Sequence, residues 1–304
     1  MYLGPPTKWT TKVTKTAIKN DIVMSVRAPV GPVNIVKSEI CIGRGLASIR
    51  CLESINYLYC FYMLRSIEPQ INGNTGSTFA SINRNDICKL KIPLPPLSVQ
   101  EEIVAELDSY QKIIDGAKQV VDNWKPKIDI DPEWVTAKLK DVCSFEYGKG
   151  LPEKDRISGP YPVLGSNGVA GYHNRSFVKG PVIVVGRKGS AGEVVWEESD
   201  CWPIDTTYYI THEEKKIAYR YLYYTLKMAT LQNLRGGTGI PGLNRNDAYD
   251  LEIYLPDLPT QLSIVNRIDS EQKLIDANRE LIKLYEQKIK DRIERLWKSK
   301  QKEM

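Results

Sequence analysis

The residues best suited to bind a phosphate or a base edge lie in a glycine-rich loop after an apolar run. Residues 185–192 read Val-Gly-Arg-Lys-Gly-Ser-Ala-Gly. Glycines let a main chain approach a partner closely, and Arg187, Lys188 and Ser190 can donate hydrogen bonds to phosphates or bases. A tight hairpin with solvated charges would have the same pattern, and the residues alone favour neither. The Gly-x-x-x-x-Gly-Lys-Ser/Thr spacing of a P-loop is absent.

A second polar loop, residues 165–175, combines amide, hydroxyl, aromatic and guanidinium groups. Such groups can read base edges, and the candidates are Ser166, Asn167, Tyr172, Asn174 and Arg175. His173 lies among them, and we interpret it as the cap of a turn rather than as an acid or base. This loop is therefore predicted to be a binding surface.

Two matching loops, residues 74–84 and 236–245, provide the remaining candidates. They are Thr75, Ser77, Thr78 and Arg84 in the first loop, and Thr238, Asn244 and Arg245 in the second. Both loops run into an Asn-Arg-Asn-Asp motif, at residues 83–86 and 244–247. That motif suits a nucleic-acid contact, and it suits equally a turn with a helix cap. Both interpretations stay open.

Enzymatic interpretations find little support in the sequence. With only His173 and His212, a histidine triad or zinc site has few residues to draw on. Asp205 with Glu213 and Glu214 loosely resembles a nuclease carboxylate set, but the spacing is that of surface charge. The Asp/Asn-Pro-Pro-Tyr/Phe site of a methyltransferase and the Gly-x-Gly-x-x-Gly turn of a nicotinamide enzyme are both missing.

The composition is that of an ordinary protein of about two domains. Apolar residues make up 42% of the 304 positions and charged residues 26%, and the net charge of +5 permits a nucleic-acid partner without demanding one. No apolar run approaches a membrane span and no signal peptide is recognisable, so we expect a cytoplasmic protein. The six cysteines form no C-x-x-C pair and are interpreted as reduced core residues.

The elements that would position these loops occur twice. Asn83-Arg84-Asn85-Asp86 returns 161 positions later as Asn244-Arg245-Asn246-Asp247, and Gln100 returns as Gln261. With a small gap, residues 22–27 align with 182–187, which makes Ser25 and Arg27 the first-copy counterparts of the glycine-rich loop. So long a period indicates two large copies rather than a stacked array.

The expected elements follow the same order in both copies. We predict strands at residues 21–26, 33–36, 40–49 and 87–94 in the first copy and at 182–185, 193–196, 207–211 and 251–255 in the second, with helices at 55–66 and 217–228. Residues 161–174 are predicted to be a loop. The tyrosines Tyr57, Tyr59, Tyr221, Tyr223 and Tyr224 are interpreted as core aromatics of the two helices rather than base-stacking residues.

A long helix with a heptad seam closes each copy. Over residues 98–125 the seam positions are Ile103, Leu107, Tyr110, Ile114, Ala117, Val121 and Trp124, and over 261–290 they begin with Ile264, Ile268, Glu271, Ile275, Asn278, Ile282 and Tyr285. Ser98 and Glu101 suit a capping box. The polar Glu271 and Asn278 would fix the register of the seam.

The two helices pair most simply with each other, in antiparallel fashion. At 1.5 Å per residue the first spans about 40 Å, close to the ~34–36 Å between half-sites of two-fold DNA-binding proteins. The helices would then act as a spacer between two similar domains. The alternative is that each is an ordinary helix packed on its own domain.

The doubled motifs resemble the DNA specificity (S) subunit of type I restriction-modification systems. Each copy has a β-rich segment, then an Asn-Arg-Asn-Asp loop, a strand, Pro-x-Leu-x-x-Gln and the long helix. The second copy also opens with Trp-Val-Thr-Ala-Lys-Leu-Lys-Asp-Val-Cys at residues 134–143. The resemblance covers nearly the whole chain, but residues 134–160 have no counterpart in the first copy. Either the chain is truncated or another segment completes that domain.

The resemblance implies an α+β fold with two β-rich target recognition domains, an antiparallel coiled coil and a pseudo-two-fold internal duplication. The expected boundaries are a short first recognition domain at 1–97, spacer helix one at 98–126, a linker at 127–133, the second recognition domain at 134–259, and spacer helix two with a basic tail at 260–304.

The resemblance also implies a non-catalytic subunit acting in host defence on a bipartite double-stranded DNA target. It favours DNA contact by the loop residues named above. The spacer would dock methyltransferase (M) subunits, two of them expected, through Ile103, Leu107, Ile114, Val121, Ile264, Ile268, Ile275 and Ile282. The M subunits would use S-adenosylmethionine, and restriction (R) subunits would use ATP and Mg²⁺; this chain itself would bind no cofactor or metal. The alternatives are an assembly scaffold without DNA binding and a fragment of a fused restriction-methylation enzyme.

Overall fold

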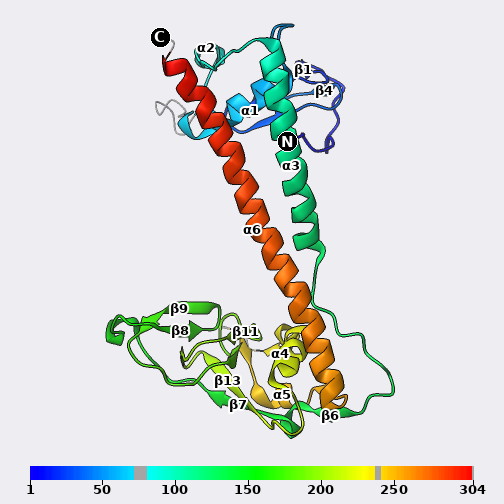
Figure 1. The fold of residues 1–304 in the computed structure, drawn as a ribbon, viewed down its shortest axis with the longest axis vertical. Coiled ribbons are helices and arrows are strands. Elements are labelled where there is room, and N and C mark those ends of the chain that lie inside the picture. The colour runs from blue at the N-terminus through cyan, green and yellow to red at the C-terminus, as the bar shows by residue number, and fades with distance from the viewer. Residues whose placement is uncertain (72–80, 237–240, 303–304) are drawn as a thin grey trace. The chain divides into compact units, whose positions relative to one another are not determined.

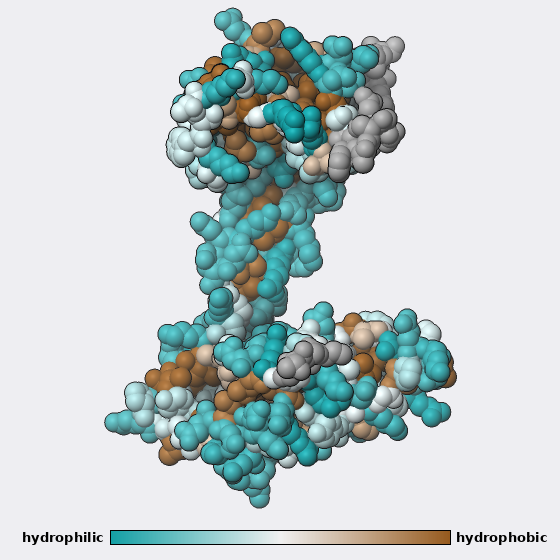
Figure 2. All heavy atoms as spheres, turned by 180° about the vertical axis from the view of Figure 1, so that it is seen from behind, coloured by the Kyte–Doolittle hydropathy of each residue, from teal (hydrophilic) through white to brown (hydrophobic). Residues whose placement is uncertain are grey.

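The computed structural model describes residues 1–71, 81–236 and 241–302 and divides the chain into two compact units (Figure 1). Unit 1 comprises Met1–Asn123 and Asp276–Met304, and unit 2 comprises Trp124–Ile275. Helices and strands are mixed in both units, which confirms the predicted α+β class. Figure 2 shows polar side chains over most of each unit, with apolar patches reaching the surface.

Unit 2 is built around a four-stranded antiparallel sheet in the order β11-β10-β13-β7. Its strands are β7 (Cys143–Tyr147), β10 (Val182–Gly186), β11 (Val194–Glu197) and β13 (Thr207–His212). A second sheet has the order β12-β8-β9 and contains β8 (Tyr161–Gly165), β9 (Gly168–His173) and β12 (Trp202–Pro203). Two short pairs are β6 (Thr136–Lys138) with β16 (Glu252–Tyr254) and β14 (Arg235–Gly236) with β15 (Gly242–Leu243).

The helices of unit 2 are α4 (Tyr219–Met228), α5 (Arg245–Tyr249) and the first part of α6 (Leu258–Lys302). Short 3-10 turns are η2 (Leu139–Asp141), η3 (Glu153–Asp155) and η4 (Leu231–Leu234). The core joins the sheet to α4 and α6, for example through Phe145, Leu222 and Ile268, each fully buried. Burying these apolar side chains is the main force that holds the layers together.

Unit 1 repeats a shorter version of this plan. Its sheet has the order β3-β2-β5, with β2 (Ile22–Ser25), β3 (Val33–Ile35) and β5 (Leu46–Ile49), beside the pair β1 (Thr16–Ala17) and β4 (Ile40–Cys41). The helices are α1 (Tyr57–Ile67), α2 (Arg84–Cys88), α3 (Leu97–Asn123) and the last part of α6, with the turn η1 (Glu68–Gln70). Its core contains Met24, Phe61 and Leu107.

A buried glutamine ties the long helix to the rest of each unit in the same way. Gln261 Oε1 accepts from the Ala218 N–H at 2.8 Å, and its Nε2 donates to the carbonyls of Lys216 (3.2 Å) and Pro256 (2.8 Å). Gln100 makes the equivalent three bonds, to Asn56, Ser54 and Pro95. Both side chains are 0% exposed. The repeated Pro-x-Leu-x-x-Gln motif therefore has a structural role in both copies.

The tyrosines of α1 and α4 are core residues, as predicted. Tyr59, Tyr221, Tyr223 and Tyr224 are buried, and Tyr57 is half-buried. Tyr59 donates to the Pro93 carbonyl and Tyr221 to the Tyr254 carbonyl, both at 3.0 Å. Tyr62 and Tyr224 each donate to an aspartate of the long helix, Asp108 and Asp269. The hydroxyls of Tyr62 and Tyr224 thus join helix to helix, and those of Tyr59 and Tyr221 join a helix to the segment before the long helix.

Within unit 1, α3 and the last part of α6 run antiparallel, as the heptad pattern predicted (Figure 1). Lys118 Nζ contacts Glu286 Oε1 at 3.0 Å, whereas Glu106, which comes earlier in α3, contacts Arg292, which comes later in α6, at 2.7 Å. The rings of Tyr110 in α3 and Tyr285 in α6 also meet, with 5.4 Å between their centroids. The seam positions therefore pack helix on helix.

The predicted start of the first long helix is wrong by one residue. The helix α3 begins at Leu97, so Ser98 lies inside its first turn and cannot be the N-cap. The polar seam residue Glu271 has a specific partner in unit 2, because its Oε2 accepts from Trp124 Nε1 at 3.0 Å.

Two predicted elements differ from the structure. Residues 87–94 form no strand: α2 ends at Cys88, and the sheets of the described ranges include none of residues 89–94. Residues 161–174, predicted to be a loop, instead form the hairpin of β8 and β9. The cysteine prediction is also only partly right, since Cys60, Cys143 and Cys201 are buried but Cys41 and Cys88 are exposed.

The alignment of the two glycine-rich segments must shift by one residue. The Ser25 N–H donates to the Pro32 carbonyl, and the Ser25 carbonyl accepts from the Gly31 N–H. The main chain of Gly186 makes the same two bonds, with the Glu193 carbonyl and the Gly192 N–H. Likewise the Val26 N–H donates to the Gly45 carbonyl, and the Arg187 N–H donates to the Thr206 carbonyl. The structural counterpart of Arg187 is therefore Val26, and Arg27 corresponds to Lys188.

Among the helices described, none is long and apolar enough to span a membrane.

Candidate nucleic-acid interface

Two arginines and an exposed tyrosine meet at one end of the main sheet of unit 2. Tyr147 is the last residue of β7, Arg187 follows the last residue of β10, and Arg245 opens α5. Strand β13 lies between β7 and β10, and its pairing sets Tyr208 opposite both Tyr147 and Val185. Antiparallel pairing therefore brings residues that are far apart in the sequence to the same end of the sheet.

The three side chains form a rigid cluster, which we call the Tyr147 cluster. The guanidinium carbons of Arg187 and Arg245 lie 5.3 and 5.0 Å from the centroid of the Tyr147 ring. Arg187 donates to the Asp205 carbonyl through Nε (2.9 Å) and Nη2 (2.7 Å), and Arg245 Nη1 donates to the Phe145 carbonyl at 3.4 Å. Cation–π contacts and these bonds restrict both guanidinium groups before any ligand arrives.

The Tyr147 cluster offers a surface that is both aromatic and cationic. Tyr147 is 50% exposed, while its ring also leans on buried Tyr208 at 5.2 Å between centroids. Burial raises the pKa of Tyr208, whose hydroxyl donates to the Leu243 carbonyl. No carboxylate pairs with Arg187 or Arg245 among the described residues. Their positive charge is thus available to an anionic partner such as a phosphate.

The glycine-rich loop has the conformation that its glycines predict. Gly189 and Gly192 have φ angles of +76° and +79°, which other residues adopt only with strain. A Cβ on Gly186 would lie 2.2 Å from the Ser190 carbonyl oxygen, so the loop could not close with a larger residue there. The exposed side chain of Lys188 follows directly after Arg187. The loop is a tight turn that presents Lys188 to solvent beside the half-buried Arg187.

A second aromatic–cation pair, Lys149 with Trp202, lies on the neighbouring turn. Lys149 Nζ is 5.7 Å from the Trp202 ring, and Trp202 Nε1 donates to the Lys149 carbonyl at 2.8 Å. The turn is held against β12 because a Cβ on Gly148 would lie 2.2 Å from the Ile204 carbonyl oxygen. Tyr147, Lys149 and Trp202 were not predicted as site residues. The Tyr-Gly-Lys-Gly sequence at 147–150 was the available signal.

The candidates of residues 165–175 separate into two places. Ser166 lies beside the glycine-rich loop, with its Oγ 3.5 Å from the position of a Cβ on Gly189. Asn167 shares the turn of the hairpin and is exposed. Tyr172 pairs with Pro162 at the opposite end of that hairpin, and Asn174 and Arg175 follow it. Only the first two therefore adjoin the Tyr147 cluster, while Tyr172 is 55% exposed elsewhere on unit 2.

His173 is a buried residue of β9 and does not cap a turn of its own loop, which corrects the prediction. It is 6% exposed, and its Nδ1 accepts from the Ile157 N–H at 3.0 Å. The asparagines of the Asn-Arg-Asn-Asp loops are helix caps. Asn244 Oδ1 accepts from the Asn246 N–H at 3.0 Å, and Asn83 forms a full capping box with Asp86. For these asparagines the cap interpretation is confirmed.

The remaining candidates belong to unit 1 or lie outside the described residues. Arg27 and Arg84 are exposed, and Ser25 Oγ donates to the Arg27 carbonyl at 2.9 Å. Because Val26 replaces Arg187 in unit 1, no second Tyr147 cluster exists in its described part. The candidates outside the described residues are Thr75, Ser77, Thr78 and Thr238.

Most of the predicted partner-binding residues point into the chain's own cores. Ile103, Leu107 and Ile114 are at most 1% exposed in unit 1, and Ile268 and Ile275 at most 2%. Such buried side chains present no surface to another subunit, so these assignments need correction. Val121, Ile264 and Ile282 are half-buried.

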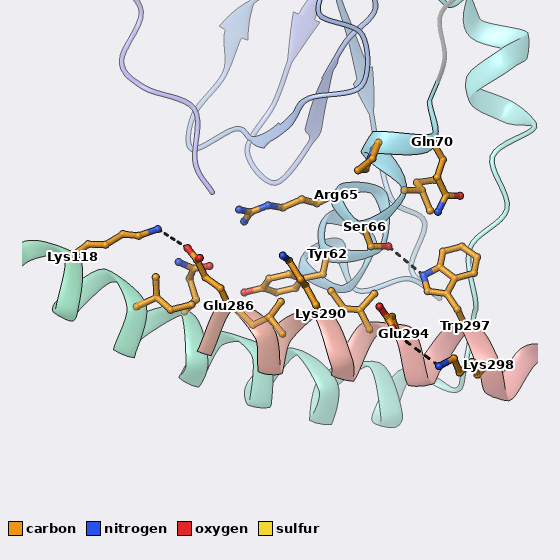
Figure 3. A pocket seen from close by; sticks show the side chains of 16 residues that line it. Tyr62, Arg65, Ser66, Gln70, Lys118, Glu286, Lys290, Glu294, Trp297 and Lys298 are labelled. Atoms are coloured by element: carbon orange, nitrogen blue, oxygen red, sulfur yellow. Dashed lines mark hydrogen bonds and ion pairs between the residues drawn. The ribbon is translucent and has the colours of Figure 1, made fainter. Parts of the chain in front are cut away.

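The helices of unit 1 instead offer a cavity of about 720 Å³ between α1, α3 and α6 (Figure 3). Its apolar floor includes Tyr62, Ile289 and Ile293, and Trp297 closes one side with its Nε1 donating to Ser66 Oγ at 3.2 Å. Charged side chains surround it, namely Arg65, Lys118, Glu286, Lys290, Glu294 and Lys298. An apolar floor with a mixed charged rim suits a polypeptide surface.

The chain has two units of the same plan, and a long helix completes each of them. Unit 2 also carries a preorganised surface that is aromatic and cationic. These features are those of a duplicated protein that recognises a macromolecule. The described residues contain no group of three or more His, Cys, Asp or Glu that could hold a metal ion. The chain belongs to the family described as the type I restriction modification DNA specificity domain, which matches residues 7–122 and again residues 132–287.

Known relatives agree with this assignment. The chain is 39% identical over 128 residues to a putative type I restriction enzyme specificity subunit, MjaX, of Methanocaldococcus jannaschii, a match covering 40% of this chain and 30% of that protein. It is 26% identical over 248 residues to a putative type I specificity subunit of Mycoplasma pneumoniae, covering 74% of this chain and 66% of the relative. The matches thus span less than two thirds of each relative's length.

A solved structure shares the fold. The S subunit of a type I restriction-modification system from M. genitalium superposes with a TM-score of 0.65 at 16% identity, covering 95% of this chain and 85% of that one.

Proposed function

We propose that the chain is the subunit that selects the DNA target of a type I restriction-modification complex. The observation that carries this proposal is the Tyr147 cluster on a member of the DNA specificity family. Guanidinium groups held in a fixed plane bind phosphates or the O6 and N7 atoms of guanine bidentately. Arg187, Arg245 and Lys188 would meet the DNA, with the Tyr147 ring in contact with both guanidinium groups.

The chemistry of such a complex would reside in other subunits. We infer that methyltransferase subunits supply S-adenosylmethionine-dependent methylation and that restriction subunits supply ATP- and Mg²⁺-dependent cleavage. This chain would bind and orient the DNA, and the cavity of unit 1 is the surface we assign to contact with a methyltransferase subunit.

Sequencing of modified bases in a host that carries the chain with its neighbouring methyltransferase genes tests the proposal. A new N6-methyladenine motif in two parts with a fixed gap is the expected result. No new methylation, in the presence of a stable complex with the methyltransferase, would favour an assembly scaffold and contradict the proposal.

The double variant Arg187→Ala with Arg245→Ala tests the site. Loss of a bidentate base contact costs about 1–3 kcal/mol, or roughly 5- to 150-fold in affinity, whereas loss of one phosphate contact lowers the salt slope by about 0.9. Fluorescence anisotropy with a duplex carrying the motif, titrated at several salt concentrations, separates the two cases.

Lys215→Ala is the matched control for this experiment. It removes one exposed cation of unit 2 from the turn after His212, at the other end of β13 and about 17 Å of strand away from the cluster. If the arginine variant bound the duplex as tightly as the control, with an unchanged salt slope, the site assignment would be wrong.

A further inference from the structure

The turn between β12 and β13 is fixed by main-chain hydrogen bonds. The Thr207 N–H donates to the Ile204 carbonyl at 2.9 Å and closes a turn whose two central residues are Asp205 and Thr206. The Ile204 N–H donates to a carbonyl of β8 at 2.9 Å, and the Thr206 carbonyl accepts from the Arg187 N–H at 2.8 Å. These bonds set the place of Asp205, and its side chain takes part in none of them.

The side chain of Asp205 is an exposed acid on a cationic surface. The carbonyl of this residue accepts two hydrogen bonds from Arg187, and its Oδ1 lies 3.8 Å from the position of a Cβ on Gly150, next to the exposed Lys149. No hydrogen bond or ion pair engages the Asp205 carboxylate within the described ranges. A carboxylate repels phosphates, so binding of the DNA backbone does not account for an acid at this place.

Unit 1 has the same turn with the opposite charge. There the Leu46 N–H donates to the Gly43 carbonyl at 3.1 Å, as the Thr207 N–H donates to Ile204 in unit 2. The counterpart of Asp205 is therefore Arg44, whose side chain is exposed. The duplication has kept the turn and reversed its charge, as expected of a position that contacts a different chemical group in each unit.

The two side chains suit different base edges. In the major groove cytosine N4 and adenine N6 present amino donors, whereas guanine presents the two acceptors O6 and N7. A carboxylate only accepts hydrogen bonds, and a guanidinium group only donates them. Asp205 thus fits cytosine or adenine and repels the acceptors of guanine, whereas Arg44 fits guanine.

We propose that these two turns carry specificity-determining residues, with Asp205 accepting from the amino group of a cytosine or adenine and Arg44 donating to a guanine. This inference rests on the proposed function, and it assigns chemically different bases to the two halves of the DNA target. The main-chain frame of the turn is the same in both units, so the difference in the base that is read comes from the side chain.

Selection of duplexes from a random library tests the proposal, with the full chain assembled with its methyltransferase subunits. We expect Asp205→Ala to lose a preference for cytosine or adenine at one position of one half of the target. Arg44→Ala is expected to lose a preference for guanine in the other half. Glu214→Ala is the matched control, because it removes an exposed carboxylate from the turn after β13, at the other end of that strand. It should select the same target as the unchanged chain.

Base analogues then measure the contact itself. A duplex in which the selected cytosine is replaced by a pyrimidinone, or the selected adenine by purine, lacks only the amino group. The unchanged chain should bind this duplex roughly 5- to 150-fold more weakly than the parent duplex, and Asp205→Ala should bind the two within about twofold of each other.

Three results would overturn the proposal. One is an Asp205→Ala variant that selects the same target as the unchanged chain. Another is tighter binding of that variant to every duplex with unchanged preferences, because the carboxylate would then only repel phosphates. The third is an Arg44→Ala variant that binds all duplexes equally more weakly, because Arg44 would then contact phosphate. These results all require that the unchanged chain selects a target; if it selected none, the proposed function itself would be wrong.

Discussion

Replacing Gln261 with alanine removes three hydrogen bonds from a site with no solvent. The side chain is 0% exposed and bonds to Ala218, Lys216 and Pro256 at 2.8–3.2 Å. A typical internal hydrogen bond contributes about 0.5–1.5 kcal/mol net, and each partner left buried and unpaired costs about 1–3 kcal/mol. Some relaxation toward solvent will reduce the sum, so we expect unit 2 to lose about 3–5 kcal/mol of unfolding free energy.

The loss should appear as a lower melting temperature and as local opening. For a domain of this size about 1 kcal/mol corresponds to roughly 2–4 °C, so a decrease of about 6–20 °C is expected. Tryptophan fluorescence reports chiefly on unit 2, which holds Trp124, Trp134, Trp196 and Trp202. Hydrogen exchange should show faster exchange in α4, whose first turn the glutamine holds. The equivalent variant Gln100→Ala should instead speed exchange in α1.

Gln232→Ala is the matched control. This half-buried glutamine of unit 2 has one long bond, from Nε2 to Glu193 Oε1 at 3.3 Å, so its removal should cost about 0.5–1.5 kcal/mol. If Gln261→Ala destabilised unit 2 by no more than this control, the glutamine would not be the tie between α6 and the sheet, and the reasoning would be refuted.

Two further predictions concern titratable groups. Burial disfavours the charge of Asp21, but hydrogen bonds from Arg50, the Ile18 N–H and Ser48 outweigh it and hold the pKa of that carboxyl below its usual value. A depressed folded-state pKa stabilises unit 1 above about pH 3.9, the unfolded value, and the stabilisation is lost as pH falls through the folded-state pKa. Asp21→Asn should therefore flatten the decline of the urea midpoint between about pH 5 and pH 2; an unchanged slope would contradict the pairing. Burial also raises the pKa of Cys143 and of Cys201 to about 12, so iodoacetamide at pH 8 should modify the exposed Cys41 and Cys88 first. Mass spectrometry of the native protein that found Cys143 alkylated at the same rate would contradict its burial.

Local patterns in the sequence predicted the elements whose own residues determine them. The heptad seams predicted both long helices, because every third or fourth residue had to be apolar for α3 and α6 to pack. The apolar run at 182–185 predicted β10, which is buried on both faces. The Asn-Arg-Asn-Asp motif was left with two interpretations, and the capping hydrogen bonds decided between them.

The predictions that failed concern segments whose structure depends on a distant part of the chain. Residues 91–93 and 252–254 are equivalent, yet only the second is a strand, because only the second has β6 beside it. Strand formation depends on the neighbour more than on the segment itself. The Tyr147 cluster was missed for the same reason, since no spacing in the sequence brings Tyr147 to Arg187 and Arg245. It takes the register of β7, β13 and β10 to do so.

The core of unit 1 includes Ile293, which lies after all of unit 2 in the chain. During synthesis unit 2 therefore has its whole sequence available before unit 1 does. Until the last part of α6 has emerged from the ribosome, α3 has only α1 packed on it, and the core of unit 1 lacks Ile293. The first-made part of the chain thus waits for one of the last to complete its core, and an incomplete apolar core of this kind makes a folding intermediate prone to aggregation.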